Sequence, residues 1–319
     1  MKMPRPTPPL LLAISLLVLA WPASCADPVL FPVSKDAATS LYSIPVRDGA
    51  NHVVDLAGPL LWSTCARDHL PAKLSCKDPV CKLANAYRAP SCRIAGRPCK
   101  KKCTAYPYNP VTGKCAAAGL IHTRLVVGDL TTVLAFTALH TRKGNPLHYI
   151  PVQAIAVDQP PPVLLPAGGV VLCSRVAFTA LRPDVYRPVV DAFDRGQARN
   201  DAKVDKVGPL ELCYNSTMLE NTRNGYAVPE ISFVFEDGKR WTFVGSNSMV
   251  QVDGQTACLA FVEMKGVKAG DPNAAAVVVG GFQMENHLLQ FDLEKKQLGF
   301  AMVPSFSECS NFDFTNSQY

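Results

Sequence analysis

The sequence predicts a protein built mainly of β-strands, with only a few short helices. Residues 41–56 contain two apolar runs that flank Asp48-Gly49, the pattern of a β-hairpin. Residues 231–244 repeat this pattern around Asp237-Gly238, with apolar and polar side chains alternating before the turn. Further short apolar runs have the length of buried strands: residues 257–262 and 275–279. Together these observations indicate an all-β fold.

One longer helix is predicted at residues 183–193, because its apolar side chains recur on one helical face. These side chains are Val185, Val189, Ala192 and Phe193. Pro188 disfavours a regular helix at its position and predicts a short turn before the main helix. Residues 283–287 form a second, shorter candidate helix.

The remaining chain adds strands and connectors. Residues 291–300 read as a strand, a turn and a returning strand. Residues 157–168 are rich in proline, which predicts a connector or an edge strand.

Residues 1–26 have the pattern of a secretory signal: Lys2 and Arg5, then an apolar stretch, then the small residues before Asp27. The apolar stretch is too short for a membrane span, and none is expected later in the chain. We therefore expect a secreted, extracellular protein. The net charge of the whole chain is +6, which is mild and gives no indication of nucleic-acid binding.

Eleven cysteines follow the predicted signal, and seven of them lie between residues 65 and 115. Secretion favours disulfides over a zinc site, although the spacing alone leaves zinc open. Because eleven is odd, at least one thiol is unpaired or forms an intermolecular bond. Asn215-Ser216-Thr217 is the only N-glycosylation sequon and is expected in an exposed loop.

Asp55 ends an apolar strand and enters the turn Leu56-Ala57-Gly58-Pro59. Five further segments accompany this turn in a recognisable order: residues 35–42, 103–110, 181–188, 260–267 and 279–285. With them the chain resembles the plant xylanase inhibitors of the TAXI type and the related basic 7S globulins, over almost all of residues 27–319. The resemblance implies the bilobal fold of pepsin-like acid proteases.

An aspartic protease needs two carboxylates that share one proton and hold a water molecule between them. By the resemblance, Asp55 holds the first position, but the hydroxyl residue and the glycine that should follow it directly are missing. Cys173 holds the second position, within residues 168–175. Arg175 lies two residues further on and is a candidate electrostatic partner there. We therefore expect no intact catalytic site, only the remnants Asp55 and Cys173, and no aspartic-protease activity.

No other catalytic or cofactor motif is visible. The six histidines fall outside nucleophile motifs, and the sequence has no P-loop, dinucleotide fingerprint or zinc-protease helix. We expect no cofactor and no metal.

The resemblance implies a plant defence protein of the apoplast or cell wall. Such proteins block microbial family 11 xylanases, which are glycoside hydrolases, by plugging their sugar cleft. Two segments would do this: the loop of residues 215–225 and the segment of residues 304–309. The contact candidates are Met218, Leu219, Ser305 and Phe306. Inhibitors of this type place a histidine where Ser305 stands, and a serine is shorter and uncharged, so tight inhibition is in question. The oligomeric state is not indicated.

The first lobe is shorter than the resemblance implies, because residues 145–150 already resemble the start of the second lobe. We expect an incomplete, disulfide-rich N-terminal lobe at residues 27–140 and a C-terminal lobe at residues 141–319. The disulfides implied by the resemblance are Cys76–Cys115, Cys81–Cys103, Cys92–Cys99 and Cys213–Cys258. Cys65 and Cys309 would lose partners in the missing stretch, and Cys173 is an extra cysteine.

Three other readings remain open. The chain could be an aspartic-type endopeptidase, as its fold suggests, or a storage or peptide-binding protein of the basic 7S globulin type. It could also be a truncated relative without a stable fold.

Overall fold

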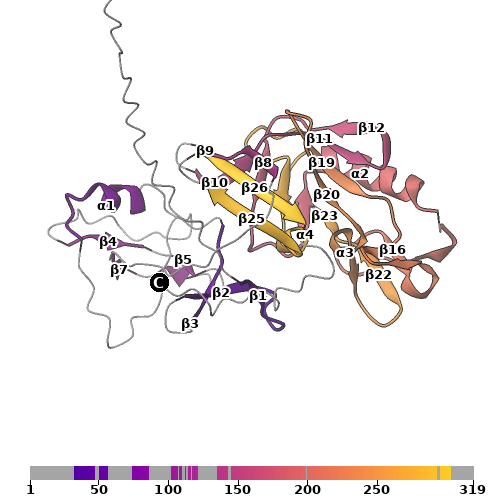
Figure 1. Cartoon of the computed structure of the whole chain (residues 1–319), viewed down its shortest axis with the longest axis horizontal. Helices are drawn as coiled ribbons and strands as arrows, with labels where there is room; N and C mark the ends of the chain where they lie inside the picture. The colour runs from indigo at the N-terminus through magenta and orange to yellow at the C-terminus, as the bar shows by residue number, and fades with distance from the viewer. Residues whose placement is uncertain are drawn as a thin grey trace, which may run out of the picture.

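A computed structural model describes most of the second half of the chain and several segments of the first half (Figure 1). The described residues are 32–46, 50–56, 74–85, 102–106, 108–109, 112, 114–115, 117–120, 135–142, 145–198, 200–292 and 295–302. Strands dominate and helices are few and mostly short, which confirms the predicted fold class.

The largest sheet has six strands in the order β23-β14-β24-β13-β10-β9. Its strands are β9 (His140–Arg142), β10 (Asn145–Ile150), β13 (Val170–Leu172), β14 (Thr179–Leu181), β23 (Phe261–Glu263) and β24 (Val277–Val279). β13 is central, pairing antiparallel with β10 and parallel with β24, and its side chains are buried. This position makes the end of β13 a rigid place from which to present a side chain.

A four-stranded sheet has the order β12-β11-β19-β20. Its strands are β11 (Val152–Val157), β12 (Gln159–Leu164), β19 (Ile231–Phe235) and β20 (Arg240–Phe243). The hairpin of β19 and β20 is confirmed, with Gly238 at φ +79° in its turn. The proline-rich segment forms β12 at the sheet edge, where missing N–H donors do not break a ladder.

Two further sheets complete the C-terminal half (Figure 1). One has the order β15-β16-β22-β21 and the other the order β25-β26-β8. The strands are β8 (Ala135–Ala138), β15 (Lys203–Val204), β16 (Cys213–Asn215), β21 (Met249–Gln251), β22 (Thr256–Leu259), β25 (His287–Asp292) and β26 (Gln297–Met302). The pairing of β25 with β26 confirms the predicted strand, turn and strand. A small hairpin joins β17 (Asn221–Thr222) to β18 (Gly225–Tyr226).

The described N-terminal segments form small sheets. β1 (Ser34–Lys35), β2 (Tyr42–Val46) and β3 (Ala50–Val53) make one sheet, and the pairing of β2 with β3 confirms the first predicted hairpin. The other elements are α1 (Pro79–Ala84), β4 (Thr104–Ala105), β5 (Tyr108–Asn109), β6 (Lys114–Cys115) and β7 (Ala118–Gly119). β4 pairs with β7, and β5 pairs with β6.

Two of the expected disulfides are present: Cys81–Cys103, which ties α1 to β4, and Cys213–Cys258, which joins β16 to β22. Cys76 and Cys115 are each disulfide-bonded, and Cys173 is free and buried. Cys65, Cys92, Cys99 and Cys309 lie outside the described residues.

Helix α2 (Pro183–Gly196) is the predicted long helix. The other short helices are η1 (Asn200–Ala202), η2 (Ser216–Met218), α3 (Gly245–Ser248) and α4 (Gly281–Met284). The predicted apolar face is buried, and Tyr186 and Val190 extend it. The expected turn at Pro188 is wrong, because α2 runs through Pro188 without a break. Burial of the face on both sides of Pro188 outweighs the lost hydrogen bond.

Replacing Pro188 with alanine should stabilise the protein by roughly 1–2 kcal/mol. Pro188 is exposed inside α2, so alanine restores a helical N–H without disturbing the core. The gain is smaller than the full helix penalty of proline because alanine also loosens the unfolded chain. Urea unfolding measures it. Pro183→Ala is the matched control, since proline is tolerated at the first turn; an equal gain there would contradict this explanation.

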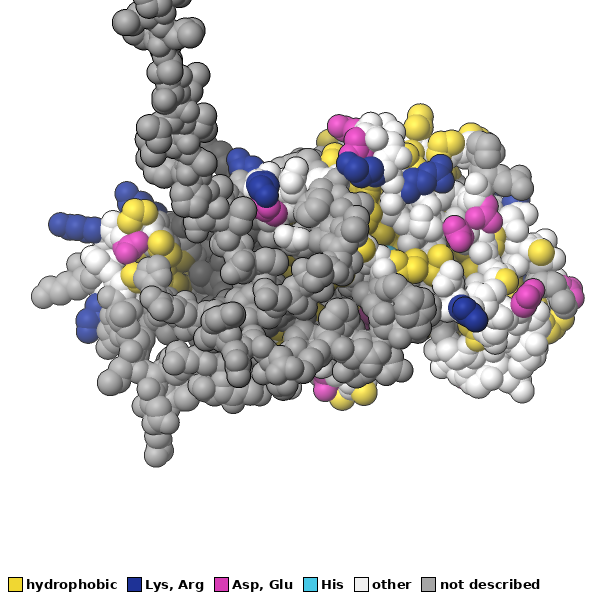
Figure 2. All heavy atoms as spheres, in the orientation of Figure 1, with side chains coloured by type: hydrophobic (Ala, Val, Ile, Leu, Met, Phe, Trp, Pro, Cys, Tyr) yellow, Lys and Arg dark blue, Asp and Glu magenta, His cyan; other side chains and the backbone are white. Residues whose placement is uncertain are grey.

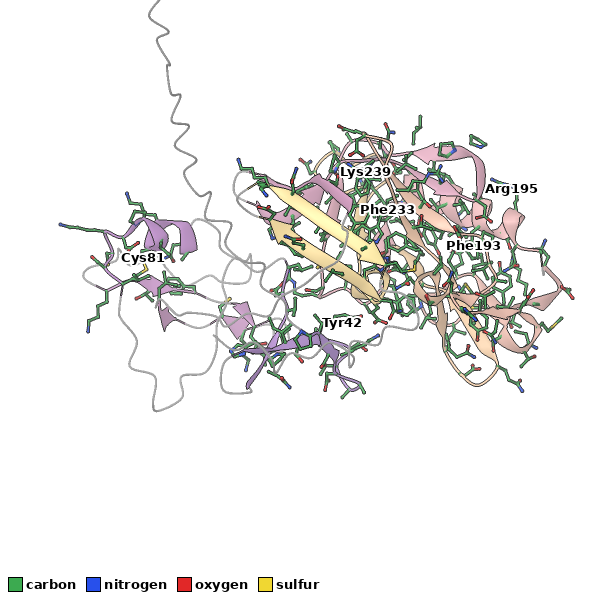
Figure 3. All side chains as sticks on the ribbon, viewed as in Figure 1. Tyr42, Cys81, Phe193, Arg195, Phe233 and Lys239 are labelled. Carbon is green, nitrogen blue, oxygen red and sulfur yellow. A yellow bond between two sulfur atoms is a disulfide. The ribbon has the colours of Figure 1, made fainter. Side chains whose placement is uncertain are left out.

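A single large hydrophobic cluster fills the C-terminal half between the sheets and α2. Phe193 of α2 and Phe233 of β19 lie within this half, whereas Arg195 and Lys239 lie at its surface (Figure 3). Phe233 packs edge-on against Trp241 and Phe243, with ring centroids 6.3 and 4.9 Å apart. Such aromatic pairs stabilise the core beyond their buried area.

Two histidines contact this core. His287 packs against both Trp241 and Phe243, and His148 packs against Phe291. Burial lowers the pKa of both histidines below the ordinary value of about 6.5, because the charged imidazolium loses hydration.

The protein should therefore lose stability as the pH falls below about 6.5. In that range the two histidines bind protons in the unfolded chain but not in the folded protein. Their contribution to the free energy of unfolding is therefore complete above the unfolded pKa and declines below it. Urea midpoints at pH 7.5 and pH 5.0 measure the loss. In a His148→Gln, His287→Gln variant the loss should be smaller, and an undiminished loss would contradict this assignment.

The N-terminal strands are fastened to the C-terminal half through Glu285, just after α4. Its carboxylate accepts hydrogen bonds from Tyr42 Oη at 2.5 Å and Lys35 Nζ at 2.8 Å. Burial, together with this carboxylate, raises the pKa of Tyr42 far above its ordinary value. A Cβ on Gly281 would lie 2.1 Å from the Tyr42 ring, so glycine is what permits this close approach.

Candidate functional site

Asp55 lies two residues beyond the end of β3. The extended chain that leads to it is held by a hydrogen bond from Val54 N to Tyr42 O at 2.8 Å. The Asp55 side chain is 16% exposed, so it is largely shielded from solvent. The following residue, Leu56, packs against the main hydrophobic cluster. The first of the two predicted site residues is therefore fixed at the junction of the N-terminal strands with the core.

Cys173 directly follows the central strand β13. Its backbone N–H donates to Val279 O at 3.0 Å, which continues the pairing of β13 with β24. Its side chain is buried, and the thiol is free. The second predicted site residue thus occupies a rigid, well-defined position and carries a thiol, where the resemblance implies a carboxylate in a peptidase.

The hydroxyl of Ser174 joins these two turns. Ser174 Oγ donates to Val54 O at 2.5 Å and accepts from Leu56 N at 3.1 Å. It thereby contacts the backbone on both sides of Asp55, from a position 120 residues away from Val54 in the sequence. The turn of Cys173 therefore faces the turn of Asp55, as the resemblance implies. Leu56 has no hydroxyl, so its side chain cannot return such a contact.

Arg175 completes the arrangement. Its Nε lies 3.3 Å from Asp55 Oδ1, and its side chain is 33% exposed. The electrostatic partner of Arg175 is thus the carboxylate of Asp55, on the opposite turn. The sequence predicts an electrostatic role for Arg175 because it is close to Cys173, but it does not predict the contact with Asp55.

This geometry differs from that of an acid protease in both halves. A proton-sharing pair requires two carboxylates, and here one carboxylate is paired with a guanidinium while the other position holds a thiol. A thiol is a weak hydrogen-bonding group and does not orient a water molecule as a carboxylate does. The arrangement can link the two turns, but it lacks the acid and base that peptide hydrolysis needs.

Sequence reasoning missed the role of Ser174. A signal was present, since Ser174 stands directly after the position of the second aspartate, where the Asp-Thr/Ser-Gly turn carries its hydroxyl. This turn therefore carries a hydroxyl, but a thiol stands before it where the resemblance implies a carboxylate. The contact of Ser174 with Val54 and Leu56 is structural, since it joins two backbone segments.

The predicted partner contacts have different surroundings. Leu219 is only 6% exposed and packs in the main hydrophobic cluster, so it is not available to contact a partner, which corrects that expectation. Its apolar side chain is more stable in the core than in water. Met218 is partly buried against the same cluster. Ser305 and Phe306 lie outside the described residues.

The loop expected to carry these contacts continues into the hairpin of β17 and β18. Residues 220–224 are all exposed, and Arg223 lies in the turn of the hairpin. The exposed hairpin therefore lies downstream of Met218 and Leu219, the residues that the sequence singled out.

Asn215 is the last residue of β16 and caps η2. Its Oδ1 accepts hydrogen bonds from Thr217 N at 3.1 Å and Thr217 Oγ1 at 2.7 Å. The side chain is partly exposed, and Thr217 is exposed.

Within the described ranges, no group of three or more histidine, cysteine or acidic side chains is arranged to hold a metal ion. Among the same residues, none of the helices combines the length and hydrophobicity that a bilayer crossing requires. Charged side chains of both signs are spread over the visible described surface, without one large patch of a single sign (Figure 2).

Comparison with known proteins relates this geometry to a family. A family model described as "Xylanase inhibitor C-terminal" matches residues 146–302. Among curated proteins, "Chitinase CLP" of Oryza sativa subsp. japonica is 37% identical over 420 aligned residues, covering 96% of this chain and 98% of the rice protein. "Probable aspartic proteinase GIP2" of Nicotiana benthamiana is 31% identical, covering 61% of this chain and 45% of that protein.

Solved structures show the same fold. The crystal structure of edgp has a TM-score of 0.70 at 22% identity, covering 89% of this chain and 97% of that one. Basic 7S globulin from soybean has a TM-score of 0.67 at 21% identity, covering 90% and 99%. The near-complete match to the rice protein, above 30% identity, shows that this chain belongs to the family of TAXI-type xylanase inhibitors and basic 7S globulins, which has the pepsin-like fold.

Proposed function

We propose that this protein is a secreted, non-proteolytic binding protein that inhibits a microbial family 11 xylanase, in plant defence. The observation that carries the proposal is the altered pair of turns, in which Arg175 holds Asp55 and Cys173 stands in the second catalytic position. A fold whose own catalysis is lost keeps its stable surface loops, and these can serve recognition. The match of residues 146–302 to a xylanase-inhibitor model supports this target.

The hairpin of β17 and β18 is the proposed contact. Retaining and inverting glycosidases act through two carboxylates in their sugar cleft. An exposed guanidinium pairs with a carboxylate through two parallel hydrogen bonds, which a serine hydroxyl cannot do. Arg223 at the hairpin turn can therefore supply the cation that is missing at Ser305.

Titration of a family 11 xylanase with the purified protein tests this proposal. We expect inhibition by the wild-type protein, a weakening of at least about tenfold in Arg223→Ala, and a strengthening in Ser305→His. Arg195→Ala is the control, because Arg195 is exposed at the end of α2, on a different element. Absence of both inhibition and binding by the wild-type protein would overturn the xylanase proposal and favour a storage or peptide-binding role.

We also propose the boundaries expected from the sequence: a signal at residues 1–26, a short first lobe at 27–140 and a second lobe at 141–319. The alignment to the rice protein supports a shortened chain. It has 420 positions, so this chain of 319 residues has no residue at 101 or more of them (420 − 319). We place the missing stretch in the second half of the first lobe. An extracellular location and a glycan on Asn215 belong to the same proposal.

Chitin hydrolysis is a second candidate, favoured by the name of the rice relative and the near-complete match to it. Release of reducing sugar from chitin oligosaccharides by the purified protein, but not by an inactivated control, would favour chitin hydrolysis over inhibition. No release at high protein concentration would remove it.

A further inference from the structure

A cavity of about 560 Å³ lies on the C-terminal half, away from the turns of Asp55 and Cys173. It is bounded by the start of α2, by residues 206–211 and by residues 263–267. Its volume falls within the range of small-ligand sites. The ring of Tyr186, which is 1% exposed, forms part of the wall and gives the cavity a rigid base.

One carboxylate of this cavity is already satisfied. Glu211 accepts two parallel hydrogen bonds from Arg187, at 2.8 and 3.0 Å, and a further one from Tyr186. The Arg187 guanidinium lowers the pKa of Glu211, and burial with nearby carboxylates raises the pKa of Tyr186. Arg187, Glu211 and Tyr186 thus form a closed network at one side of the cavity and leave little capacity for a ligand.

Three other charged side chains of the cavity take no part in this hydrogen-bond network. Lys206, Lys265 and Glu263 are exposed and form no hydrogen bond or ion pair among the described residues, although the charge of Lys206 acts on Glu211 and that of Glu263 on Tyr186. The two ammonium groups and the carboxylate together favour a ligand that carries negative charge and also donates hydrogen bonds. The remaining wall includes Pro209 and Val267, whose apolar surfaces suit the C–H faces of a ring.

We propose that this cavity binds an acidic oligosaccharide, with a uronic-acid carboxylate held by Lys206 and Lys265 and sugar hydroxyls donating to Glu263. A sugar fits better than an acidic peptide, because each uronic-acid ring carries several hydroxyls beside its carboxylate, and these hydroxyls can donate hydrogen bonds to Glu263. A pyranose ring also offers apolar C–H faces to Pro209 and Val267 beside its hydroxyls. The proposal is independent of xylanase inhibition.

Calorimetric titration of the full-length protein with trigalacturonic acid tests the site. The fully methyl-esterified trisaccharide is the matched ligand, since it keeps the ring and hydroxyls and removes the charges. We expect the acid to bind and the ester to bind at least about tenfold more weakly. A Lys206→Ala, Lys265→Ala variant should lose at least about tenfold in affinity, whereas Lys239→Ala, on the distant β19–β20 hairpin, should not change it.

Val267→Trp, which fills the cavity without changing its charge, should also abolish binding while the thermal midpoint is retained. Equal binding of acid and ester would overturn the charge recognition. Equal or tighter binding of triglutamate would overturn the choice of a sugar. No binding of trigalacturonic acid, or binding unaffected by the double lysine variant, would overturn the site itself.

Discussion

Replacing Arg182 with methionine will lower the free energy of unfolding by about 3 kcal/mol. Arg182 is 1% exposed at the start of α2, and its Nε and Nη2 contact both carboxylate oxygens of Asp184 at 2.7 and 2.9 Å. Its Nη1 donates to Ala167 O at 2.9 Å and Asp271 O at 2.6 Å. Methionine keeps most of the volume but leaves these acceptors without donors. Urea or guanidinium unfolding measures the loss.

The matched control is Arg187→Met, in the same helix. Arg187 also makes a paired contact with a carboxylate, that of Glu211, but both side chains are about half exposed, at 50% and 42%. Water replaces the lost partner there, so the expected loss is below about 1 kcal/mol. Similar losses in the two variants would show that burial of Arg182 does not determine its contribution.

Replacing Gln283 with leucine will destabilise the protein by about 3–4 kcal/mol. Gln283 of α4 is fully buried, and its Oε1 accepts from Thr179 N and Thr179 Oγ1, both at 2.8 Å. Its Nε2 donates to Asn247 O at 3.0 Å and Ala260 O at 2.9 Å. Leucine is close in size but would leave buried backbone groups of three segments unsatisfied. The change in denaturation midpoint measures the effect.

Gln251→Leu serves as the control for this variant. The Nε2 of Gln251 donates to Ser216 Oγ and Asp253 O, at 2.9 and 2.6 Å, and the residue is exposed. Gln251 and Asp253 are exposed, so solvent can replace most of what is lost in the substitution, and we expect a loss of about 1 kcal/mol or less. A loss at Gln283 no larger than that at Gln251 would contradict the proposed role of the buried amide.

Local patterns accounted for much of the fold. The hairpins of β2 with β3 and of β19 with β20 were predictable, because alternation and an Asp-Gly turn are both short-range signals. The buried face of α2 was predictable from helical spacing. The continuity of α2 through Pro188 was not, since it depends on packing against strands that are distant in the sequence. The burial of Leu219 escaped prediction for the same reason.

The candidate site was predictable in part. Asp55 and Cys173 could be assigned because the segments around them resemble the two active-site turns of the family. The contacts of Ser174 with Val54 and Leu56, and of Arg175 with Asp55, join segments more than 100 residues apart, and no local pattern specifies them. The same holds for the cavity beside Tyr186, whose walls come from α2 and two separate loops.

We predict that the pair of Asp55 with Arg175, opposite Cys173, does not activate water for peptide hydrolysis. Incubation of the purified protein with acid-denatured haemoglobin at low pH, with and without a statine-type inhibitor, tests it most directly. We predict no cleavage above that of a buffer control. Cleavage that the inhibitor abolishes would contradict the claim and make the protein an aspartic-type endopeptidase.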